Sequence, residues 1–207
     1  LRPDTMDVLK VLMSEPLLSD FALVGGTALA LHYGHRVSED IDLFVWEKFD
    51  VDFLLLELSK TLEHSVKFKT PIGAHIFVKG VKTDLVYFPA KPIRTVITKK
   101  GIRLLSPEDI AAMKLNAIAG NGTRSKDFVD IYFILKQYSV NDIIGFYKTK
   151  YASRNQLHVI KSLNYFDDIS INDWPKMIIE KKLTLSKVKK TILSQIKIFS
   201  DKFLAEQ

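Results

Sequence analysis

Two aspartates, Asp40 and Asp42, stand two positions apart in the stretch SEDIDLFV. The stretch reads as a strand, and because strand side chains alternate between faces, both carboxylates should project from the same face. Carboxylates held close together repel each other, so they suit a site where a divalent cation neutralises them. Oxygen ligands favour Mg²⁺, which binds one or two carboxylates together with substrate phosphates. Surface strands often carry such a pair without any function, so the spacing alone does not establish a metal site.

A third acidic residue, Asp84, lies within the strand-like run VKTDLVYF. Burying an unpaired carboxylate among apolar neighbours is costly, which indicates that Asp84 is there for a reason. If its strand lies beside the strand of Asp40 and Asp42, we expect three carboxylates to converge on one metal site.

A glycine pair precedes these acids in the chain. The run FALV (21–24) predicts a buried strand, Gly25, Gly26 and Thr27 predict a turn, and ALALHYG predicts a short helix. A strand, a turn and a helix N-terminus together present backbone N–H groups to a phosphate. A glycine pair by itself is more often an ordinary turn, but here an Asp-x-Asp pair follows it.

The whole string GGTALALHYGHRVSEDIDLF resembles the signature of the DNA-polymerase-β-like nucleotidyltransferase superfamily, and specifically of the AbiEii/AbiGii toxin-type nucleotidyltransferases. In that family a Gly-Gly-Thr or Gly-Ser turn is followed by an Arg-x-Ser-x-Asp-x-Asp stretch. The matching residues here are Arg36, Ser38, Asp40 and Asp42.

A second motif of the same family occurs further along the chain. The family has a lysine on one helix and an (Arg/Lys)-Asp-x-x-Asp motif at the start of the next, and Lys114, Lys126, Asp127 and Asp130 match it. Lys114 lies four residues from the apolar Ile110 and Ile118, so it should sit on or beside the apolar stripe of its helix. Simple snorkelling would also explain that position. Asp127 and Asp130 share a helix face, and Asp127 in the first turn also suits the helix dipole.

The resemblance covers roughly residues 21–135 and implies a role for each matched residue. It implies that Asp40, Asp42 and Asp84 hold Mg²⁺ or Mn²⁺, with Asp84 as the third ligand or as the group that accepts the proton of the attacking hydroxyl. Nucleotide binding is implied for a larger set: Gly25, Gly26, Thr27, Arg36, Ser38, Lys114 and Asp130. Asp127 is implied to orient Lys114 or to assist the nucleophile.

Hydrophobic periodicity places the secondary structure that must position these residues. In the first half we expect helices over 4–15 and 51–63, strands over 40–46, 65–70, 74–78 and 81–88, and a hairpin turn at Lys79-Gly80. The second half reads as helical, with Ser106 and Ser125 as N-caps and helices over 107–119, 126–138, 141–150, 154–164, 173–182 and 184–204. The expected fold is α+β: a nucleotidyltransferase-type mixed sheet with flanking helices over 1–103, then a helical domain over 104–207 that completes the active-site cleft.

Composition narrows the class of protein. Of the 207 residues 47% are hydrophobic and none is cysteine, which excludes wholesale disorder, a disulfide scaffold and a thiolate zinc site. No apolar run approaches the ~18 residues of a membrane span, so we expect a cytoplasmic protein without a membrane partner. Residues 1–103 hold 14 basic and 13 acidic side chains, a net of +1, whereas residues 104–207 hold 16 and 11, a net of +5.

Six lysines cluster near the end of the basic half, and Glu180 is the acidic residue among them. The lysines are Lys176, Lys181, Lys182, Lys187, Lys189 and Lys190. Such a cluster suits a phosphate backbone, although a solvated helix face explains it equally well. The histidines suggest no metal site: His32 and His35 lack a third ligand, and His75 reads as an ordinary strand residue.

Together these observations predict an enzyme: an Mg²⁺-dependent nucleotidyltransferase that moves a nucleoside monophosphate from an NTP to an acceptor hydroxyl. RNA, tRNA first, is the favoured acceptor, and the resemblance implies the toxin of a toxin–antitoxin or abortive-infection system, with an antitoxin protein as partner. Two alternatives stay open: an acceptor that is a small molecule or a protein, and a non-catalytic nucleotide-binding or antitoxin-like protein. The complete set of Asp40, Asp42, Asp84 and Lys114 argues against the second.

Overall fold

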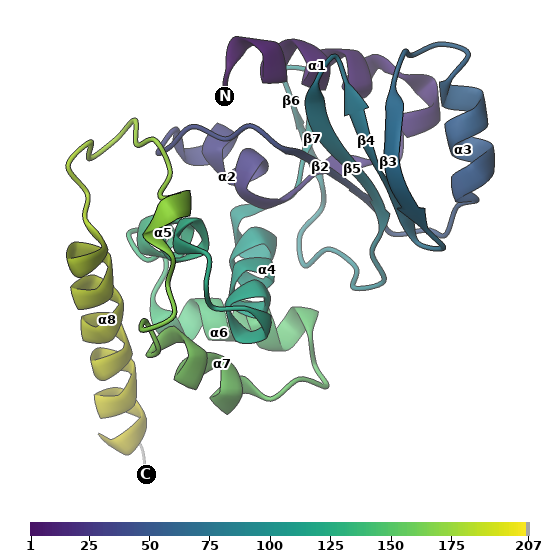
Figure 1. Ribbon diagram of the computed structural model, residues 1–207. Coiled ribbons are helices and arrows are strands. Elements are labelled where there is room, and N and C mark those ends of the chain that lie inside the picture. Colours follow the sequence, from purple (N-terminus) through teal and green to yellow (C-terminus); the bar gives the residue numbers. More distant parts are fainter. Residues whose placement is uncertain (206–207) are drawn as a thin grey trace. The chain divides into compact units, whose positions relative to one another are not determined.

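The computed structural model describes residues 1–205, and the chain folds into two compact units (Figure 1). The first, here the sheet unit, comprises Leu1–Leu31 and Ser38–Ser106. The second, here the helical unit, comprises His32–Val37 and the chain from Pro107 onward. With the expected domain boundary between residues 103 and 104, residues 32–37 would belong to the first domain. In the structure this short segment belongs to the helical unit instead.

The sheet unit is built on a seven-stranded mixed sheet whose strands follow the order β3-β4-β5-β2-β1-β7-β6. The strands are β1 (Ala22–Leu23), β2 (Ile41–Val45), β3 (Ser65–Thr70), β4 (Gly73–Val78), β5 (Val81–Tyr87), β6 (Ile97–Lys99) and β7 (Ile102–Leu104). The β2–β5 and β1–β7 pairs are parallel and the others antiparallel. The helices of this part are α1 (Pro3–Ser14), α3 (Val51–Leu58) and α2 (Gly25–Tyr33), with a 3₁₀ turn at Pro16–Leu18. The α+β fold class expected from the sequence is confirmed.

The two faces of the sheet differ in burial. Ile41, Leu43 and Val45 of β2 are buried, whereas Asp42 and Phe44 between them are only half-buried, and β5 alternates in the same way. The buried face contributes to the core, in which α1 contacts β5 and β7. The other face, here the open face, therefore carries every second residue of β2 and β5, including the two aspartates.

Two of the tight hairpins in this sheet turn on residues with positive φ angles, and the sequence predicted one of these two. Lys79 and Gly80 both have positive φ angles, 47° and 78°, as the predicted turn between β4 and β5 requires. Lys100 and Gly101 form the same kind of turn between β6 and β7, with φ of 51° and 77°. This second hairpin was missed because β6 is three residues long and wholly exposed, so it has no alternating pattern.

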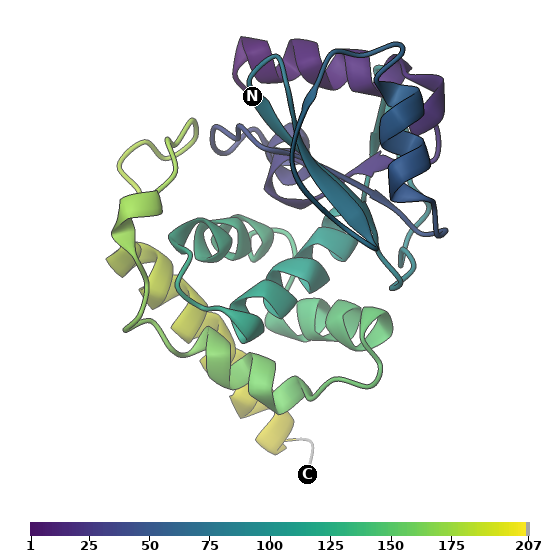
Figure 2. The ribbon, with the colours of Figure 1, turned by 45° about the vertical axis from the view of Figure 1, so that its right-hand side comes forward.

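The helical unit contains α4 (Pro107–Gly120), α5 (Ser125–Ile134), α6 (Val140–Lys150), α7 (Gln156–Leu163) and α8 (Leu185–Ala205), with a 3₁₀ turn at Ile171–Asp173. Helix α4 packs against α5, α6 and α7, and the long yellow helix α8 lies against α5 and α6 (Figure 2). Within residues 1–205 no helix combines the length and the apolar character needed to cross a membrane.

The predicted helix over 173–182 is wrong. Proline lacks an N–H and keeps the preceding residue out of the helical region, and Trp174 before Pro175 accordingly has a ψ of 124°. The chain instead runs extended beside residues 35–37: Val37 N–H donates to the Lys176 carbonyl at 2.9 Å, and Ile178 N–H to the His35 carbonyl at 2.9 Å. We call residues 176–179 the strap.

The predicted N-cap of α5 is also corrected. Ser125 is the first helical residue rather than the cap, and Arg124 occupies the cap position without a capping side chain. The N-terminus of α5 instead receives its hydrogen-bond acceptor from a residue far along the chain. Asp173 Oδ1 accepts from Ser125 N–H at 3.2 Å and from Ser125 Oγ at 2.6 Å. Helices α5 and α3 end at Ile134 and Leu58, about one turn before their predicted ends.

Candidate active site

Four residues form a row across the open face, from the edge strand inward. The register pairs Phe68 of β3 with His75 of β4, His75 with Asp84 of β5, and Asp84 with Asp42 of β2. Because residues paired across neighbouring strands project from the same face, their side chains lie side by side. We call Phe68, His75, Asp84 and Asp42 the transverse row.

Contacts along this row are specific. His75 Nδ1 lies 2.5 Å from Asp84 Oδ1, and since a carboxylate oxygen accepts, the imidazole donates through Nδ1. Lys82 Nζ lies 3.5 Å from the other oxygen of Asp84. The Phe68 ring packs on the His75 ring with centroids 3.9 Å apart and planes inclined by 32°. The predicted proton acceptor or metal ligand Asp84 therefore has fixed neighbours on both oxygens.

The glycine pair, which was predicted to form a turn but instead begins α2, meets the other end of the row. Gly25 begins α2 with φ +65°, and a Cβ on it would lie 2.7 Å from Asp42 Oδ2. A side chain at this position would collide with the carboxylate. Only glycine accommodates both the backbone angle and the close approach. Turn and carboxylate are thus adjacent, as a site for a cation and a phosphate requires.

Thr27 and Ser38 position the chain rather than presenting free hydroxyls. Both are buried, their hydroxyl oxygens lie 2.8 Å apart, and Thr27 Oγ1 also donates to the backbone carbonyl of Asp40. These contacts fasten the segment directly before β2, which carries Asp42.

The structure brings two of the three predicted metal ligands together. Asp42 and Asp84 are paired in register, whereas Asp40 precedes β2 and is paired with neither. Across residues 1–205, no three His, Asp or Glu side chains are grouped as a ready metal site. The candidate cation site is therefore the Asp42–Asp84 pair.

A second cluster, in the helical unit, contains the other motif residues. Arg36 Nε and Nη2 bind the two oxygens of Asp130 at 2.7 and 2.9 Å, and His35 Nε2 lies 2.8 Å from Asp130 Oδ1. Lys114 Nζ lies 2.6 Å from Asp127 Oδ1 and 2.7 Å from Asp130 Oδ2. All five residues are at most 6% exposed. We call His35, Arg36, Lys114, Asp127 and Asp130 the buried ion network.

The charges in this network hold each other in the ionised form. Burial by itself would raise the pKa of Asp130, but Arg36 and Lys114 hold it well below its usual value. Burial would likewise lower the pKa of Lys114, but Asp130 and Asp127 raise it above its usual value. Two carboxylates thus meet two cations within the network.

Arg36 and Asp130 were predicted to bind the nucleotide, and here they bind each other. The bidentate contact engages both oxygens of Asp130 and two nitrogens of Arg36. Unlike the two oxygens of Asp130, Asp127 Oδ2 is buried without a hydrogen-bond partner. Arg124 Nε lies 3.5 Å from this oxygen. Asp127 therefore has one buried oxygen that accepts no hydrogen bond, while its Oδ1 contacts Lys114.

Sequence reasoning missed His75 and Phe68 as members of the site. A signal for His75 was present, because a two-residue turn at Lys79-Gly80 pairs Val78 with Val81 and hence His75 with Asp84. A similar signal existed for Phe68, because a two-residue turn at Pro71-Ile72 pairs Thr70 with Gly73 and hence Phe68 with His75.

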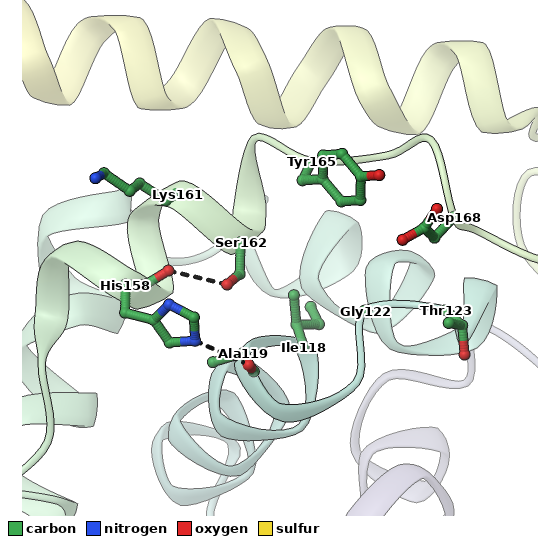
Figure 3. Close-up of a pocket in the computed structure, with 9 residues that line it drawn as sticks. All are labelled: Ile118, Ala119, Gly122, Thr123, His158, Lys161, Ser162, Tyr165 and Asp168. Carbon is green, nitrogen blue, oxygen red and sulfur yellow. Dashed lines mark hydrogen bonds between the residues drawn. The ribbon is translucent and has the colours of Figure 1, made fainter.

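The helical unit also contains a pocket of about 380 Å³ between α4 and α7 (Figure 3). Two of the polar side chains that line the pocket form hydrogen bonds with other lining residues. His158 Nε2 lies 3.0 Å from the Ala119 carbonyl, and Ser162 Oγ donates to the His158 carbonyl at 2.9 Å. None of the predicted site residues lines it.

Comparison with known proteins agrees with this geometry. Two structures from Helicobacter pylori share the fold over the whole chain: a candidate nucleotidyltransferase, 19% identical with a TM-score of 0.61 over 99% of that chain, and JHP933, 19% identical with a TM-score of 0.56 over 96%. The antibiotic-resistance factor ANT(2'')-Ia shares the fold over 72% of this chain and 95% of its own, at 16% identity and a TM-score of 0.50.

A relative in sequence is the uncharacterized protein aq_aa25 of Aquifex aeolicus (strain VF5), 29% identical over 174 residues, which cover 81% of this chain and 84% of that protein. The family described as "Nucleotidyl transferase AbiEii toxin, Type IV TA system" matches residues 7–192, a range that contains the transverse row, the glycine turn and the buried ion network. The resemblance seen in the two sequence motifs is thereby confirmed, and the chain belongs to the AbiEii family of nucleotidyltransferase toxins.

Proposed function

We propose that this enzyme transfers a nucleoside monophosphate from an NTP to a hydroxyl group of RNA, with tRNA as the favoured acceptor, in an Mg²⁺-dependent reaction. The observation that supports this most directly is the adjacency of the Gly25 turn, Asp42 and Asp84 on the open face. Such a site combines a phosphate-binding backbone with oxygen ligands for a cation.

Asp42 and Asp84 would hold the ion, with Asp40 as a further candidate just before β2. Mg²⁺ is commonly bound by one or two carboxylates plus substrate phosphates, so the register pair has the right chemistry. Mn²⁺ has the same preference for oxygen ligands. When bound, the ion neutralises the charge that develops on the transferring phosphate.

The other residues of the sheet unit would bind the phosphates and move the proton. The first N–H groups of α2, at Gly25, Gly26 and Thr27, have no partner within the helix and would be able to bind an anion. The acceptor oxygen attacks the α-phosphorus, the bond from that phosphorus to the oxygen shared with the β-phosphate breaks, and pyrophosphate leaves. The hydroxyl proton passes to a base, and Asp84 would be that base in the alternative in which Asp40, rather than Asp84, holds the ion with Asp42.

In the helical unit, we assign Lys114 and Asp127 to the reaction and the other motif residues to positioning. Asp127 Oδ1 lies 2.6 Å from Lys114 Nζ, which supports a role for Asp127 in orienting that cation. Asp130 and Arg36 hold residues 35–37 within the unit, and Ser38 follows directly.

An RNA acceptor is supported by charge. The clustered lysines from Lys176 to Lys190 are all exposed, and of these Lys187 pairs with Glu180 at 2.8 Å. Lys136 and Lys187 bind this carboxylate and hold its pKa at about 2, so Glu180 is charged at any physiological pH. The remaining lysines are available to phosphates.

Transfer of label from each α-³²P NTP to total tRNA, total protein and an aminoglycoside panel tests the proposal, with Asp42→Ala as control. We expect label in tRNA that depends on Mg²⁺ and is lost in the variant. If the label appears only in protein or in an aminoglycoside, RNA is not the acceptor and the labelled class takes its place. If no acceptor is labelled, the proposed nucleotide transfer is refuted. Growth arrest on expression, relieved by Asp42→Ala and by an antitoxin protein, would support the toxin role.

The lysine cluster is tested separately by tRNA binding at increasing salt. The triple variant Lys182→Gln, Lys189→Gln and Lys190→Gln should lower the dependence of log K on log salt by about 2–3. The matched control removes the same charge from exposed positions of the sheet unit: Lys10→Gln, Lys48→Gln and Lys99→Gln. Equal losses in both variants would exclude the cluster as the RNA surface.

A further inference from the structure

We propose that His75 is a positioning residue for the transfer reaction, whose imidazole holds the Asp84 carboxylate beside Asp42 on the open face. The inference rests on the proposed function, because it gives Asp84 its task. His75 itself touches neither nucleotide nor acceptor in this proposal and acts through Asp84.

The hydrogen bond between the two side chains is short, and the strand pairing fixes the positions of both residues. His75 Nδ1 lies 2.5 Å from Asp84 Oδ1, and the two residues are direct partners in the β4–β5 hairpin closed by Lys79-Gly80. A hydrogen bond to a carboxylate is about twice as strong as one between neutral groups. Asp84 is thereby restricted to one orientation, although it is only half-buried.

The ring of His75 is held in turn by Phe68. The two-residue turn between β3 and β4 pairs Thr70 with Gly73, and the same register places Phe68 opposite His75. The bulge between Val66 and Phe68 lies beyond this pair, further from the turn. The two rings pack with centroids 3.9 Å apart. The hairpin register therefore places an aromatic ring against the imidazole, and this contact fixes the plane of the imidazole.

Asp84 is consequently supported from two sides, by His75 on Oδ1 and by Lys82 at 3.5 Å from Oδ2. Partners of this kind, which orient a ligating or catalytic carboxylate, typically contribute 10–100-fold to metal affinity or activity. We expect His75→Ala to lower kcat by about 10–100-fold, while KM for the NTP changes by less than about threefold.

Two further substitutions separate orientation from simple packing. Asparagine places an amide nitrogen near the position of Nδ1, whereas glutamine places it near the position of Nε2. We expect His75→Asn to retain most of the rate and His75→Gln to behave like His75→Ala. The matched control is His64→Ala in the same unit, since His64 Nδ1 lies 2.9 Å from the Leu62 carbonyl and no carboxylate contact of its ring is recorded in residues 1–205. Thermal unfolding of every variant verifies that it is folded.

A readout without turnover is Mn²⁺ binding to the protein alone, measured by electron paramagnetic resonance. Affinity should fall about tenfold or more in His75→Ala and His75→Gln, and stay unchanged in His75→Asn and His64→Ala. In ¹⁵N spectra of the imidazole, the wild type should show a protonated Nδ1 whose signal shifts in Asp84→Asn.

These outcomes distinguish the inference from the proposed function. If the wild type transfers no nucleotide yet binds Mn²⁺, the proposed function fails, and unchanged Mn²⁺ affinity in His75→Ala would then overturn the inference as well. If transfer occurs but His75→Ala and His75→Asn have equal rates, only the positioning role is refuted. A wild type that neither transfers nor binds Mn²⁺ overturns both.

Discussion

The transverse row and the buried ion network use the same side chain in opposite ways. Asp42 and Asp84 lie half-buried on the open face of a sheet, where a carboxylate remains accessible to an arriving cation. Asp130 is completely buried and already bound by Arg36 and Lys114. A carboxylate in the first setting is suited to chemistry, and one in the second to holding chain segments together. Residues of one sequence motif, such as Arg36 and Asp42, therefore serve different tasks.

The largest expected effect follows from removing a charge on the open face. Asp42→Asn should lower turnover on the order of 10³-fold or more, because the proposed cation site loses one of its two carboxylates. The unfolding free energy should change by about 1 kcal/mol or less, since the side chain is only half-buried and asparagine has nearly the same shape. Transfer assays and urea unfolding measure the two quantities, and a variant that retains wild-type turnover would contradict the assignment.

The converse change is Asp130→Asn in the buried ion network. It leaves the charges of Arg36 and Lys114 without a full counterion, and breaking such a pair costs about 3–5 kcal/mol of stability. Urea unfolding measures this cost, whereas Mn²⁺ affinity of the folded fraction should stay at the wild-type value. Arg36→Lys is the milder variant, because it keeps the charge and loses the bidentate contact. If Asp130→Asn is as stable as the wild type, the network has no structural task.

Two glycines with the same backbone angle test the contact between turn and carboxylate. Gly25 and Gly34 both have φ +65°, but a Cβ on Gly34 would have no heavy atom within 4 Å. Gly34→Ala should cost about 1–2 kcal/mol of stability from the left-handed backbone and leave turnover unchanged. Gly25→Ala should add a loss of about 10–100-fold in turnover, because it displaces Asp42. Equal turnover in the two variants would show that the contact does not matter.

The smallest expected effect is a pH dependence of stability. The pKa of Asp130 is lower in the folded than in the unfolded chain, so its contribution is present above an unfolded pKa of about 4 and is lost as the pH falls below it. The difference in unfolding free energy between wild type and Asp130→Asn should therefore shrink from pH 5 towards pH 3. The pKa of Lys114 is higher in the folded than in the unfolded chain, so its contribution is lost at high rather than low pH. The difference in unfolding free energy between wild type and Lys114→Met should therefore shrink above about pH 10.5. Differences that stay constant over both ranges would contradict these shifts.

Local signals in the sequence predicted much of the fold and one half of the site. The strand that carries Asp42 and the hairpin at Lys79-Gly80 depend on residues close in sequence, and the structure has both. Two details differ, since Asp40 lies just before β2 and the residues predicted as a glycine turn are the first residues of α2. The pairing of Asp42 with Asp84 was expected on the condition that their strands are neighbours, which the register confirms.

The features that sequence reasoning did not reach depend on distant partners. Arg36 meets Asp130 94 residues further along the chain, and nothing local shows that this arginine is already engaged. The strap follows an extended path because it bonds residues 35–37, and Asp173 caps a helix that begins 48 residues earlier. Such contacts override local propensity and leave no periodic pattern to read.

The placement of residues 32–37 in the helical unit bears on how such enzymes can recombine. A chimera joined once, between residues 106 and 107, would combine Arg36 and His35 from one parent with Asp130 and Lys114 from the other. A productive exchange between relatives must transfer this hexapeptide together with the C-terminal half, in three joints instead of one. Residues 32–37 and the chain from Pro107 onward should therefore be exchanged together as one block, although they are far apart in the sequence.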